Sequence, residues 1–360
     1  MDVMKNKSVN TDALQAAVDA RARQRTDDAD ANKGPDSRED GGEGEDEHEP
    51  SERPTTLSSC VDYTDIQDHE LYYVGTAGVK VTELDAVEML QTLRKLHVRS
   101  NLLRSMASVA SLVQLEHLEL YDNQIQVIDG VQALVNLKVL DLSFNEIRSI
   151  PDLGHLQQLE ELYVANNKLT RISGLARLGK LKKLDLGANR LRAIEGLDGL
   201  ANLEELWLGK NKITTIKGLE KLAKLRITSV QSNRVVAITG FENNADLEEL
   251  YLSHNGLEKI ENVEHLTKLT TMDLAGNRIT SIPTNLAPLS QLEDLWLNDN
   301  QIAQYADVEN LAPLAALRTL YLERNPLAQD FEYRKKLEEL LPQLNQIDAT
   351  PTTSARQGRM

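Results

Sequence analysis

Leu115-Glu-His-Leu118-Glu-Leu120-Tyr-Asp-Asn123 is the stretch that decides the fold, because its phrase Leu-x-x-Leu-x-Leu-x-x-Asn returns along most of the chain. Versions of this phrase end at Asn101, Asn123, Asn145, Asn167, Asn189, Asn211, Asn233, Asn255, Asn277, Asn300 and Asn325, and the first nine asparagines follow one another at a spacing of 22 residues. A fixed period of this length indicates a repeat architecture, in which each unit buries its apolar face by stacking on its neighbours.

The phrase is typical of a short leucine-rich repeat, which predicts an α/β fold. We expect a solenoid with terminal caps, a curved parallel sheet on the concave face, and short 3₁₀ or α segments on the convex face. Alternation with period two sends the leucines inward and the x residues outward from a short strand in each repeat. The sheet should therefore contain eleven strands of this kind.

Two regular positions predict the turns of each repeat. The amide of each ladder asparagine can donate and accept hydrogen bonds, so it can satisfy buried backbone groups, and its loss should destabilise the fold by about 1 to 3 kcal/mol. Seven residues after the asparagines stand residues that tolerate a positive φ, which predicts a second tight turn. These residues are Gly130, Asp152, Gly174, Gly196, Gly218, Gly240 and Asn262.

The uneven distribution of acidic residues separates an N-terminal segment from the repeats in this chain of 360 residues. Twelve acids against Lys33 and Arg38 lie between Asp27 and Glu52, within a chain of formal charge −16. Such a stretch buries too little apolar surface to fold, so residues 1–56 are predicted to be a disordered acidic tail that is either merely solvating or touches a basic partner. Residues 57–90 are predicted to be a degenerate repeat and N-terminal cap, with Val79 at the ladder position.

The repeats are predicted to span residues 91–326, where Asn325-Pro326 leads into a different pattern. Residues 327–348 should form a C-terminal cap with an amphipathic helix that begins near Phe331 and stops at Pro342. Leu344 and Ile347 should pack back on the repeats. Residues 349–360 are predicted to be a tail.

Several classes of protein are disfavoured by what the chain lacks. Cys60 is the sole cysteine, so no intrachain disulfide is possible, which favours a reducing compartment. The sequence shows no apolar signal region and no run of 18 apolar residues, so export and membrane association are not expected. The histidines are scattered and no phosphate-binding loop or paired-cysteine motif occurs, so no cofactor and no metal are expected.

The outward residues at the middle of each strand form the most informative column. They are His97, Glu119, Asp141, Tyr163, Asp185, Trp207, Ser229, Tyr251, Asp273, Trp296 and Tyr321. Four are acidic and five aromatic, and both tryptophans of the chain are among them. Cross-strand packing alone tolerates such residues, but exposed aromatic side chains beside carboxylates are typical of a protein-binding hot spot.

This column predicts the partner's chemistry. A basic, partly apolar protein surface would present cations to the acids and apolar groups to the rings. The next outward column, from Ser143 to Ala275, consists mostly of small residues and would let the partner's backbone approach. The candidate partner-binding residues are Asp141, Tyr163, Asp185, Trp207, Tyr251, Asp273, Asp294, Trp296 and Tyr321.

Catalysis and nucleic-acid binding are both poorly supported. Asp141 and Asp185 lie two strands apart, roughly 10 Å, which would suit paired-carboxylate chemistry. An open sheet offers no desolvated pocket to raise the pKa of one acid, so no enzymatic activity is expected. The acidic face would repel phosphates. The cations Lys95, Arg99, Lys183 and Lys210 are too scattered to form a basic stripe.

Several phrases outside the leucine scaffold carry a resemblance to a known family. They include Leu118-Glu-Leu-Tyr-Asp-Asn-Gln-Ile125, Leu208-Gly-Lys-Asn-Lys-Ile213, Tyr251-Leu-Ser-His-Asn-Gly256, Trp296-Leu-Asn-Asp-Asn300 and the closing segment from Leu320 to Thr350. Over roughly residues 60–350 the chain resembles the protein phosphatase 1 regulatory subunit 7 family. The resemblance implies a concave face that clasps the catalytic subunit of protein phosphatase 1, often with a further inhibitor subunit, and controls its activity or assembly in nucleus and cytoplasm.

The resemblance also implies contact residues. The family's phosphatase-contacting acids and aromatics fall on Asp141, Tyr163, Asp185, Trp207, Asp273, Asp294, Trp296 and Tyr321. Phenylalanine is common at positions 163 and 207 of that family, and glutamate at positions 185 and 294, so these differences keep the chemistry. The docking motif of many other regulators, a basic residue followed by V-x-F, is missing, which agrees with binding through the repeats.

Two alternatives remain from the sequence. A ciliary or spliceosomal scaffold built of similar repeats would bind another protein partner instead. A hydrolase would need a concave pocket with converging carboxylates. For the favoured interpretation, we expect a monomer before the complex forms and no membrane or nucleic-acid partner.

Overall fold

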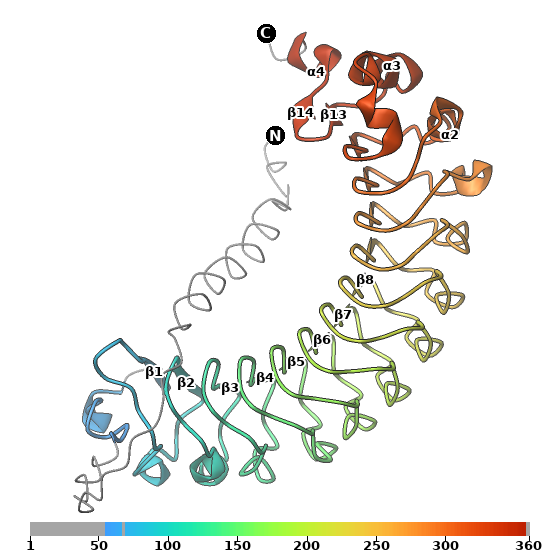
Figure 1. The fold of residues 1–360 in the computed structure, drawn as a ribbon. Coiled ribbons are helices and arrows are strands. Elements are labelled where there is room, and N and C mark those ends of the chain that lie inside the picture. Colours follow the sequence, from blue (N-terminus) through green and yellow to red (C-terminus); the bar gives the residue numbers. More distant parts are fainter. Residues whose placement is uncertain (1–54, 67–68, 358–360) are drawn as a thin grey trace, which may run out of the picture. The chain divides into compact units, whose positions relative to one another are not determined.

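The computed structural model describes residues 55–66 and 69–357 of the chain. Fourteen strands within these ranges form one sheet in sequence order from β1 to β14. Every neighbouring pair is parallel except β13 and β14, which are antiparallel. The strands lie on the inner side of the arc that the sheet follows, and the connecting segments lie outside (Figure 1). The predicted leucine-rich repeat solenoid is therefore confirmed, whereas the predicted disorder of residues 1–54 concerns residues outside the described ranges.

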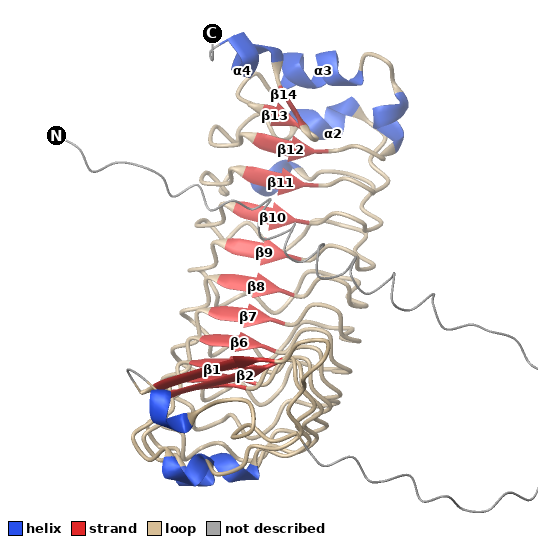
Figure 2. Cartoon of the chain, turned by 90° about the vertical axis from the view of Figure 1, so that its left-hand side faces the viewer, coloured by secondary structure: helices blue, strands red, loops and turns tan. Residues whose placement is uncertain are grey.

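The strands are short and evenly placed (Figure 2). Their bounds are β1 Glu70–Val74, β2 Lys95–Arg99, β3 His117–Glu119, β4 Val139–Asp141, β5 Glu161–Tyr163, β6 Lys183–Asp185, β7 Glu205–Trp207, β8 Ile227–Ser229, β9 Glu249–Tyr251, β10 Thr271–Asp273, β11 Asp294–Trp296, β12 Thr319–Tyr321, β13 Gln346–Ile347 and β14 Thr350–Pro351. Strands β2 to β12 carry the repeat phrase, as predicted, and the other three belong to the ends of the array.

Regular helices occur toward both ends of the array. They are η1 Tyr63–Asp65, η2 Val87–Met89, η3 Ala107–Ser111, η4 Thr284–Leu286, α2 Tyr305–Glu309, η5 Pro326–Gln329, α3 Tyr333–Leu340 and α4 Thr353–Gln357. In the repeats between η3 and η4 the outer segments consist of successive turns. Leu134 N donates to Val131 O (3.0 Å) and Leu137 N to Leu134 O (3.0 Å). The convex segments thus keep 3₁₀-type hydrogen bonds without forming continuous helices.

The asparagine ladder has the double role that the sequence predicts. In one repeat, Asn145 Oδ1 accepts from Ile125 N (2.9 Å) while Nδ2 donates to Leu120 O (2.9 Å) and Leu142 O (3.0 Å). The side chain thereby joins two successive repeats, and it is only 7% exposed. Because these backbone groups lie where water cannot reach, the amide replaces water as their partner.

The second turn position is confirmed at six of its seven residues. Gly130, Gly174, Gly196, Gly218, Gly240 and Asn262 have a positive φ. Asp152 does not, so that prediction was wrong. Its carboxylate instead accepts from Gly154 N (2.9 Å), and this side-chain bond holds the turn without a left-handed residue. A positive φ also occurs just before most ladder asparagines, for example at Phe144 (58°) and Lys210 (56°).

The N-terminal cap begins earlier than predicted and with a different register. Thr55 O already accepts from Thr82 N (2.8 Å), so the fold includes part of the segment predicted to be a tail. Leu71 pairs with Leu96, 25 residues later. The ladder position before Asn101 is therefore Thr76, and the assignment of Val79 to it was wrong because this first connection exceeds the 22-residue period.

The C-terminal cap contains the expected helix, α3, which ends before Pro342, and Leu344 and Ile347 are buried. The prediction that residues 349–360 form a tail was wrong for the part that the structure describes. Thr350–Pro351 pairs with β13, and Thr352 Oγ1 donates to Leu344 O (2.9 Å). These contacts are mostly polar, which explains why a search for apolar residues missed them.

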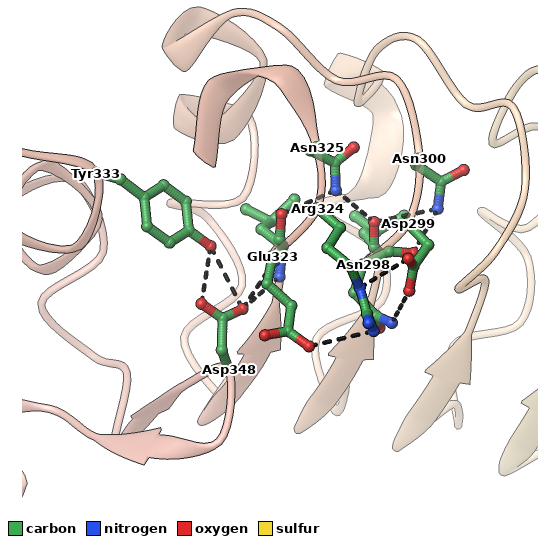
Figure 3. Close-up of polar contacts among 10 residues, drawn as sticks. Asn298, Asp299, Asn300, Glu323, Arg324, Asn325, Tyr333 and Asp348 are labelled. Carbon is green, nitrogen blue, oxygen red and sulfur yellow. Dashed lines mark hydrogen bonds and ion pairs between the residues drawn. The ribbon is translucent and has the colours of Figure 1, made fainter. Parts of the chain in front are cut away.

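A carboxylate closes the repeat sheet at β12 (Figure 3). In the preceding repeat, Leu297 N donates to Tyr321 O on the next strand (2.8 Å). At the end of the array the equivalent donor, Leu322 N, bonds to Asp348 Oδ1 (2.8 Å), and the Tyr333 hydroxyl donates to Asp348 Oδ2 (3.1 Å). Asp348 thus replaces the acceptor that a further repeat would supply.

Candidate functional site

The central column of the sheet brings together eight of the nine predicted partner-binding residues. Strand pairing sets Asp141 beside Tyr163, Tyr163 beside Asp185, and Asp185 beside Trp207. The same line continues through Tyr251, Asp273, Trp296 and Tyr321. In each of these strands the column residue is the last one, so the line follows the carboxyl ends of the strands. The ninth residue, Asp294, lies on β11 two positions before Trp296 and so belongs to the neighbouring column.

Four rings form a continuous cluster, here called the aromatic ladder, at the C-terminal half of this column. Trp207 and Tyr251 stack with their centroids 6.2 Å apart at 24°. Tyr251 and Trp296 lie 6.5 Å apart at 57°, and Trp296 meets Tyr321 edge to face at 6.1 Å. Contacts of this geometry stabilise the rings beyond the burial of their area. The cluster is therefore a preorganised apolar strip on the sheet.

The aromatic ladder spans strands rather than joining only adjacent ones. Trp207 on β7 reaches Tyr251 on β9, and Tyr251 reaches Trp296 on β11. The residues between them, Ser229 and Asp273, are only 2% and 5% exposed. The rings thus cover Ser229 and Asp273. The Asp273 carboxylate is much less accessible to solvent than its outward position in the sequence pattern indicates.

The three aspartates of the column share one local hydrogen bond. Asp141 Oδ1 accepts from Ser143 N (2.8 Å), and Asp185 Oδ1 accepts from Gly187 N (2.8 Å). Asp273 does the same with Ala275 N (3.0 Å). The small residues two positions later are therefore partners of the acids. In each of the three, one carboxylate oxygen holds the backbone just after the end of the strand.

Burial changes the acidity of these carboxyls. It raises the pKa of Asp141, and at Asp185 it raises the pKa to about 6, with a smaller contribution from the charge of Asp141. The backbone hydrogen bonds at Ser143 and Gly187 oppose this effect. Burial also raises the pKa of Asp273, where the Ser253 hydroxyl is the main opposing contact. A cationic partner would favour the charged form of each carboxyl.

A second column of glutamates, which the sequence reading did not single out, orients the polar ends of the aromatic residues. Tyr163 OH donates to Glu161 (2.7 Å), and Tyr251 OH donates to Glu249 (2.7 Å). The signal in the sequence is the recurring Glu-Leu-aromatic triplet on the strands. Because each glutamate lies two residues before its ring on the same face of the strand, its carboxylate can accept a hydrogen bond from the hydroxyl.

The N-terminal end of the face has a different character, also missed from the sequence. Tyr72 on β1 stacks on His97 with a centroid separation of 4.3 Å at 13°, and Tyr72 is 58% exposed. Glu119 pairs with His97 and accepts from Arg99 Nε (2.8 Å). Here the Glu119 carboxylate already pairs with the Arg99 guanidinium of the same chain, so the acids of the column without a cation partner in the described ranges are concentrated at Asp141 and Asp185.

The column is an open surface. A depression of about 590 Å³ lies elsewhere, at the N-terminal cap beside Cys60, Asp65 and Tyr72. Within residues 55–66 and 69–357, no group of three or more His, Cys, Asp or Glu side chains is arranged to hold a metal ion. None of the helices in these ranges is long and apolar enough to cross a membrane.

Family models match a large part of the array. One described as "Leucine-rich repeat" matches residues 242–354, and one described as "Leucine Rich repeats (2 copies)" matches residues 113–155 and 157–199. No curated protein matches the chain.

Solved structures of repeat proteins share the fold. An internalin, InlF, from Listeria monocytogenes is 26% identical, with a TM-score of 0.64 over 79% of this chain and 87% of that one. The PEPR1-AtPEP1 structure is 23% identical, with a TM-score of 0.59 over 77% and 40%. A leucine-rich repeat protein of Leptospira interrogans is 23% identical, with a TM-score of 0.52 over 73% and 86%.

Proposed function

We propose, from the premise that this chain is a leucine-rich repeat protein and that its repeats imply a scaffold for protein–protein interaction, that it is a non-catalytic regulatory subunit of protein phosphatase 1. In this proposal the concave face binds the catalytic subunit and controls its activity or assembly, in nucleus and cytoplasm. A further inhibitor subunit could share the complex. The resemblance of residues 60–350 to the regulatory subunit 7 family motivates the choice of partner.

The aromatic ladder is the observation that carries the proposal. Interface hot spots are enriched in tryptophan and tyrosine, and rigid rings lose little conformational entropy when a partner covers them. Trp207 and Trp296 are held by ring contacts before any partner arrives. Such a strip can therefore anchor an apolar part of the phosphatase surface.

The acidic half of the column would supply orientation. Asp141 and Asp185 lie next to the aromatic ladder along the same line, so a partner would place basic groups toward β4–β6 and apolar groups toward β7–β12. Charge pairs of this kind set the register and the association rate of a complex more than its affinity. Asp273 has a different role, because it is buried beneath the rings and does not face the partner.

Binding of purified phosphatase catalytic subunit, measured by calorimetry, tests the proposal. Trp296→Ala should weaken binding by about 2 kcal/mol, a common value for a hot-spot tryptophan. Asp141→Asn with Asp185→Asn keeps an acceptor for the strand-end hydrogen bonds but removes both charges, so it should slow association and reduce its salt dependence. Phe331→Ala is the matched control, since Phe331 is 95% exposed and lies in the C-terminal cap.

Equal affinity of wild type, Trp296→Ala and Phe331→Ala for the phosphatase would refute the assignment of the concave face. No binding by wild type would refute the phosphatase as partner and favour the second candidate, a ciliary or spliceosomal scaffold. That candidate uses the same preorganised aromatic ladder with a different protein. Affinity capture with wild type against Trp296→Ala as bait would then identify proteins lost only with the variant.

A further inference from the structure

The two flanks of the sheet differ in whether their cations form ion pairs within the chain. On the flank where the chain enters each strand, cations pair with acids of a neighbouring repeat. Lys182 lies 2.7 Å from Glu160, and Arg226 lies 2.7 Å from Glu248. Lys268 likewise lies 2.6 Å from Asp246. These three cations are therefore paired within the chain.

On the opposite flank, beyond the carboxyl ends of β5 to β8, six cations follow the strands, and five of them have no such partner among the described residues. We call this surface the basic flank and define it as Lys168, Arg190, Arg192, Lys210, Lys212 and Arg234. Lys168 lies 2.9 Å from Glu146. The other five side chains have no ion pair or hydrogen bond with any residue in the described ranges, although the whole chain carries a formal charge of −16.

The backbone places four of these residues at the same position in four successive repeats. The residue after each ladder asparagine donates its N–H to the preceding repeat. Arg190 N bonds to Leu169 O, Lys212 N to Leu191 O and Arg234 N to Ile213 O, each at 2.8 Å. Lys168 N makes the same bond to Ile147 O (2.8 Å). With roughly 4.8 Å between repeats, the series extends over roughly 14 Å.

Acids bound the basic flank at both ends. Glu146 occupies the equivalent position in the repeat before Lys168, and Glu258 follows in the repeat after the one that ends at Arg234. The uninterrupted series at the position after the ladder asparagine therefore covers four repeats, and the nearest further cations on this flank are Arg148 beside Glu146 and Arg278 two repeats beyond Arg234. An extended peptide rises about 3.3 to 3.6 Å per residue, so roughly four or five residues would match this length.

We propose that the basic flank binds a short, acidic segment of another protein. Arginine forks and lysine ammonium groups that lack a partner in the fold are suited to carboxylates, and Arg190, Arg192 and Arg234 can each bind one through two parallel hydrogen bonds. A nucleic acid fits less well. The basic flank has no aromatic side chain for base stacking, and a long phosphate chain would run onto Glu146 and Glu258.

This surface is separate from the aromatic ladder, since it lies beyond the ends of the strands. A protein held on the concave face would leave it available for a second partner. The inference therefore stands or falls independently of the phosphatase proposal.

Fluorescence anisotropy with a fluorescein-labelled deca-glutamate peptide and the full chain tests the inference. The variant Arg190→Gln, Lys212→Gln, Arg234→Gln removes three unpaired cations. The matched control Lys182→Gln, Arg226→Gln, Lys268→Gln removes three paired cations from the opposite flank. Circular dichroism of all three proteins should show that they are equally folded.

Wild type should bind the peptide in low salt, and the affinity should fall as salt rises toward about 150 mM, because exposed charges are screened. The basic-flank variant should bind about tenfold more weakly, and the control less than about threefold more weakly. Equal losses in both variants, or no binding by wild type, would overturn the inference. So would tighter binding of a labelled ten-residue oligothymidylate that depends on the same three cations, since it would assign the surface to nucleic acid.

Discussion

Tyr251 and Trp296 lie on strands β9 and β11, and their rings meet at a centroid distance of 6.5 Å across the intervening strand. Asp273 of β10 lies beneath them and is only 5% exposed. The sheet thus uses long aromatic side chains on alternate strands to cover a carboxyl on the strand between. The sequence pattern gives Asp273, Tyr251 and Trp296 the same outward position, yet in the structure the two rings lie above the carboxyl.

The ring contacts predict a specific effect of changing Tyr251. Tyr251→Ala removes contacts with both Trp207 and Trp296, and aromatic pairs contribute about 0.5 to 1.5 kcal/mol each beyond area burial. The variant should therefore unfold in urea with a free energy of unfolding lower by about 3 to 5 kcal/mol, the usual range for a buried aromatic truncated to alanine.

Tyr251→Phe provides the comparison for this prediction. It keeps the ring but removes the hydroxyl that donates to Glu249 at 2.7 Å, so the expected loss is about 0.5 to 1.5 kcal/mol. If alanine and phenylalanine destabilise the fold equally, the ring contacts contribute little and the aromatic ladder is not a preorganised unit.

The raised pKa of Asp185 predicts a pH-dependent stability. Burial raises the pKa from 3.8 to about 6 in the folded chain. Because the folded state binds the proton more tightly, this carboxyl favours folding fully below about pH 4, and its contribution is lost as the pH rises through 6. Asp185→Asn should therefore be more stable than wild type at pH 7.5 by at most about 3 kcal/mol, at 1.4 kcal/mol per unit of pKa.

Thermal unfolding from pH 4 to 7.5 measures this difference. The gap between Asp185→Asn and wild type should open between pH 4 and 6.5, since the asparagine can still accept from Gly187 N. Asp198→Asn serves as control, because Asp198 is exposed and lies 3.7 Å from Lys221. A constant gap across this pH range would show that Asp185 titrates like an ordinary surface carboxyl.

The C-terminal segment predicts a difference between two truncations. Deleting residues 349–360 removes β14 and two of the three backbone acceptors of Arg334, Thr350 O at 3.0 Å and Pro351 O. It also removes the bond of Thr352 to Leu344. With about 1 kcal/mol for each lost hydrogen bond, the free energy of unfolding should fall by about 2 to 5 kcal/mol. Deleting only residues 358–360 should change it little, and equal melting of both truncations would contradict a folded C-terminal segment.

The sequence predicts the fold well because one physical rule repeats in it. Each Leu-x-Leu sends its leucines inward, and Leu118, Leu140 and Leu162 are all fully buried. The rule fails where repetition ends. At the first connection Leu71 and Leu96 are 25 positions apart, which moves the ladder position to Thr76. The last segment is held by polar bonds such as that of Thr352.

The sequence predicts which residues of the candidate site share a column, but not how exposed each side chain is. Period-two alternation places Asp141, Asp185 and Asp273 outward in one column, and strand pairing agrees. Whether an outward side chain is accessible depends on whether the neighbouring rings meet over it, as Tyr251 and Trp296 do. Asp273 has a tyrosine and a tryptophan as its immediate neighbours, which lean together over it, whereas Asp141 lies beside Glu119 and Tyr163, so only the three-dimensional structure separates these acids.

Thr228 provides a test of the core itself, since it replaces the leucine of the repeat phrase on β8. Its side chain is fully buried, and its Oγ1 has no hydrogen-bond partner among the described residues. Thr228→Val has nearly the same shape without the unsatisfied hydroxyl, so it should raise the free energy of unfolding by about 1 to 3 kcal/mol. Thr270→Val is the matched control, because Thr270 Oγ1 donates to Glu248 O at 3.1 Å and its loss should destabilise the fold by about 0.5 to 1.5 kcal/mol. Urea unfolding of both variants measures the two effects, and a Thr228→Val protein no more stable than wild type would mean that the hydroxyl finds a partner in solution, for which a buried water would be the first candidate.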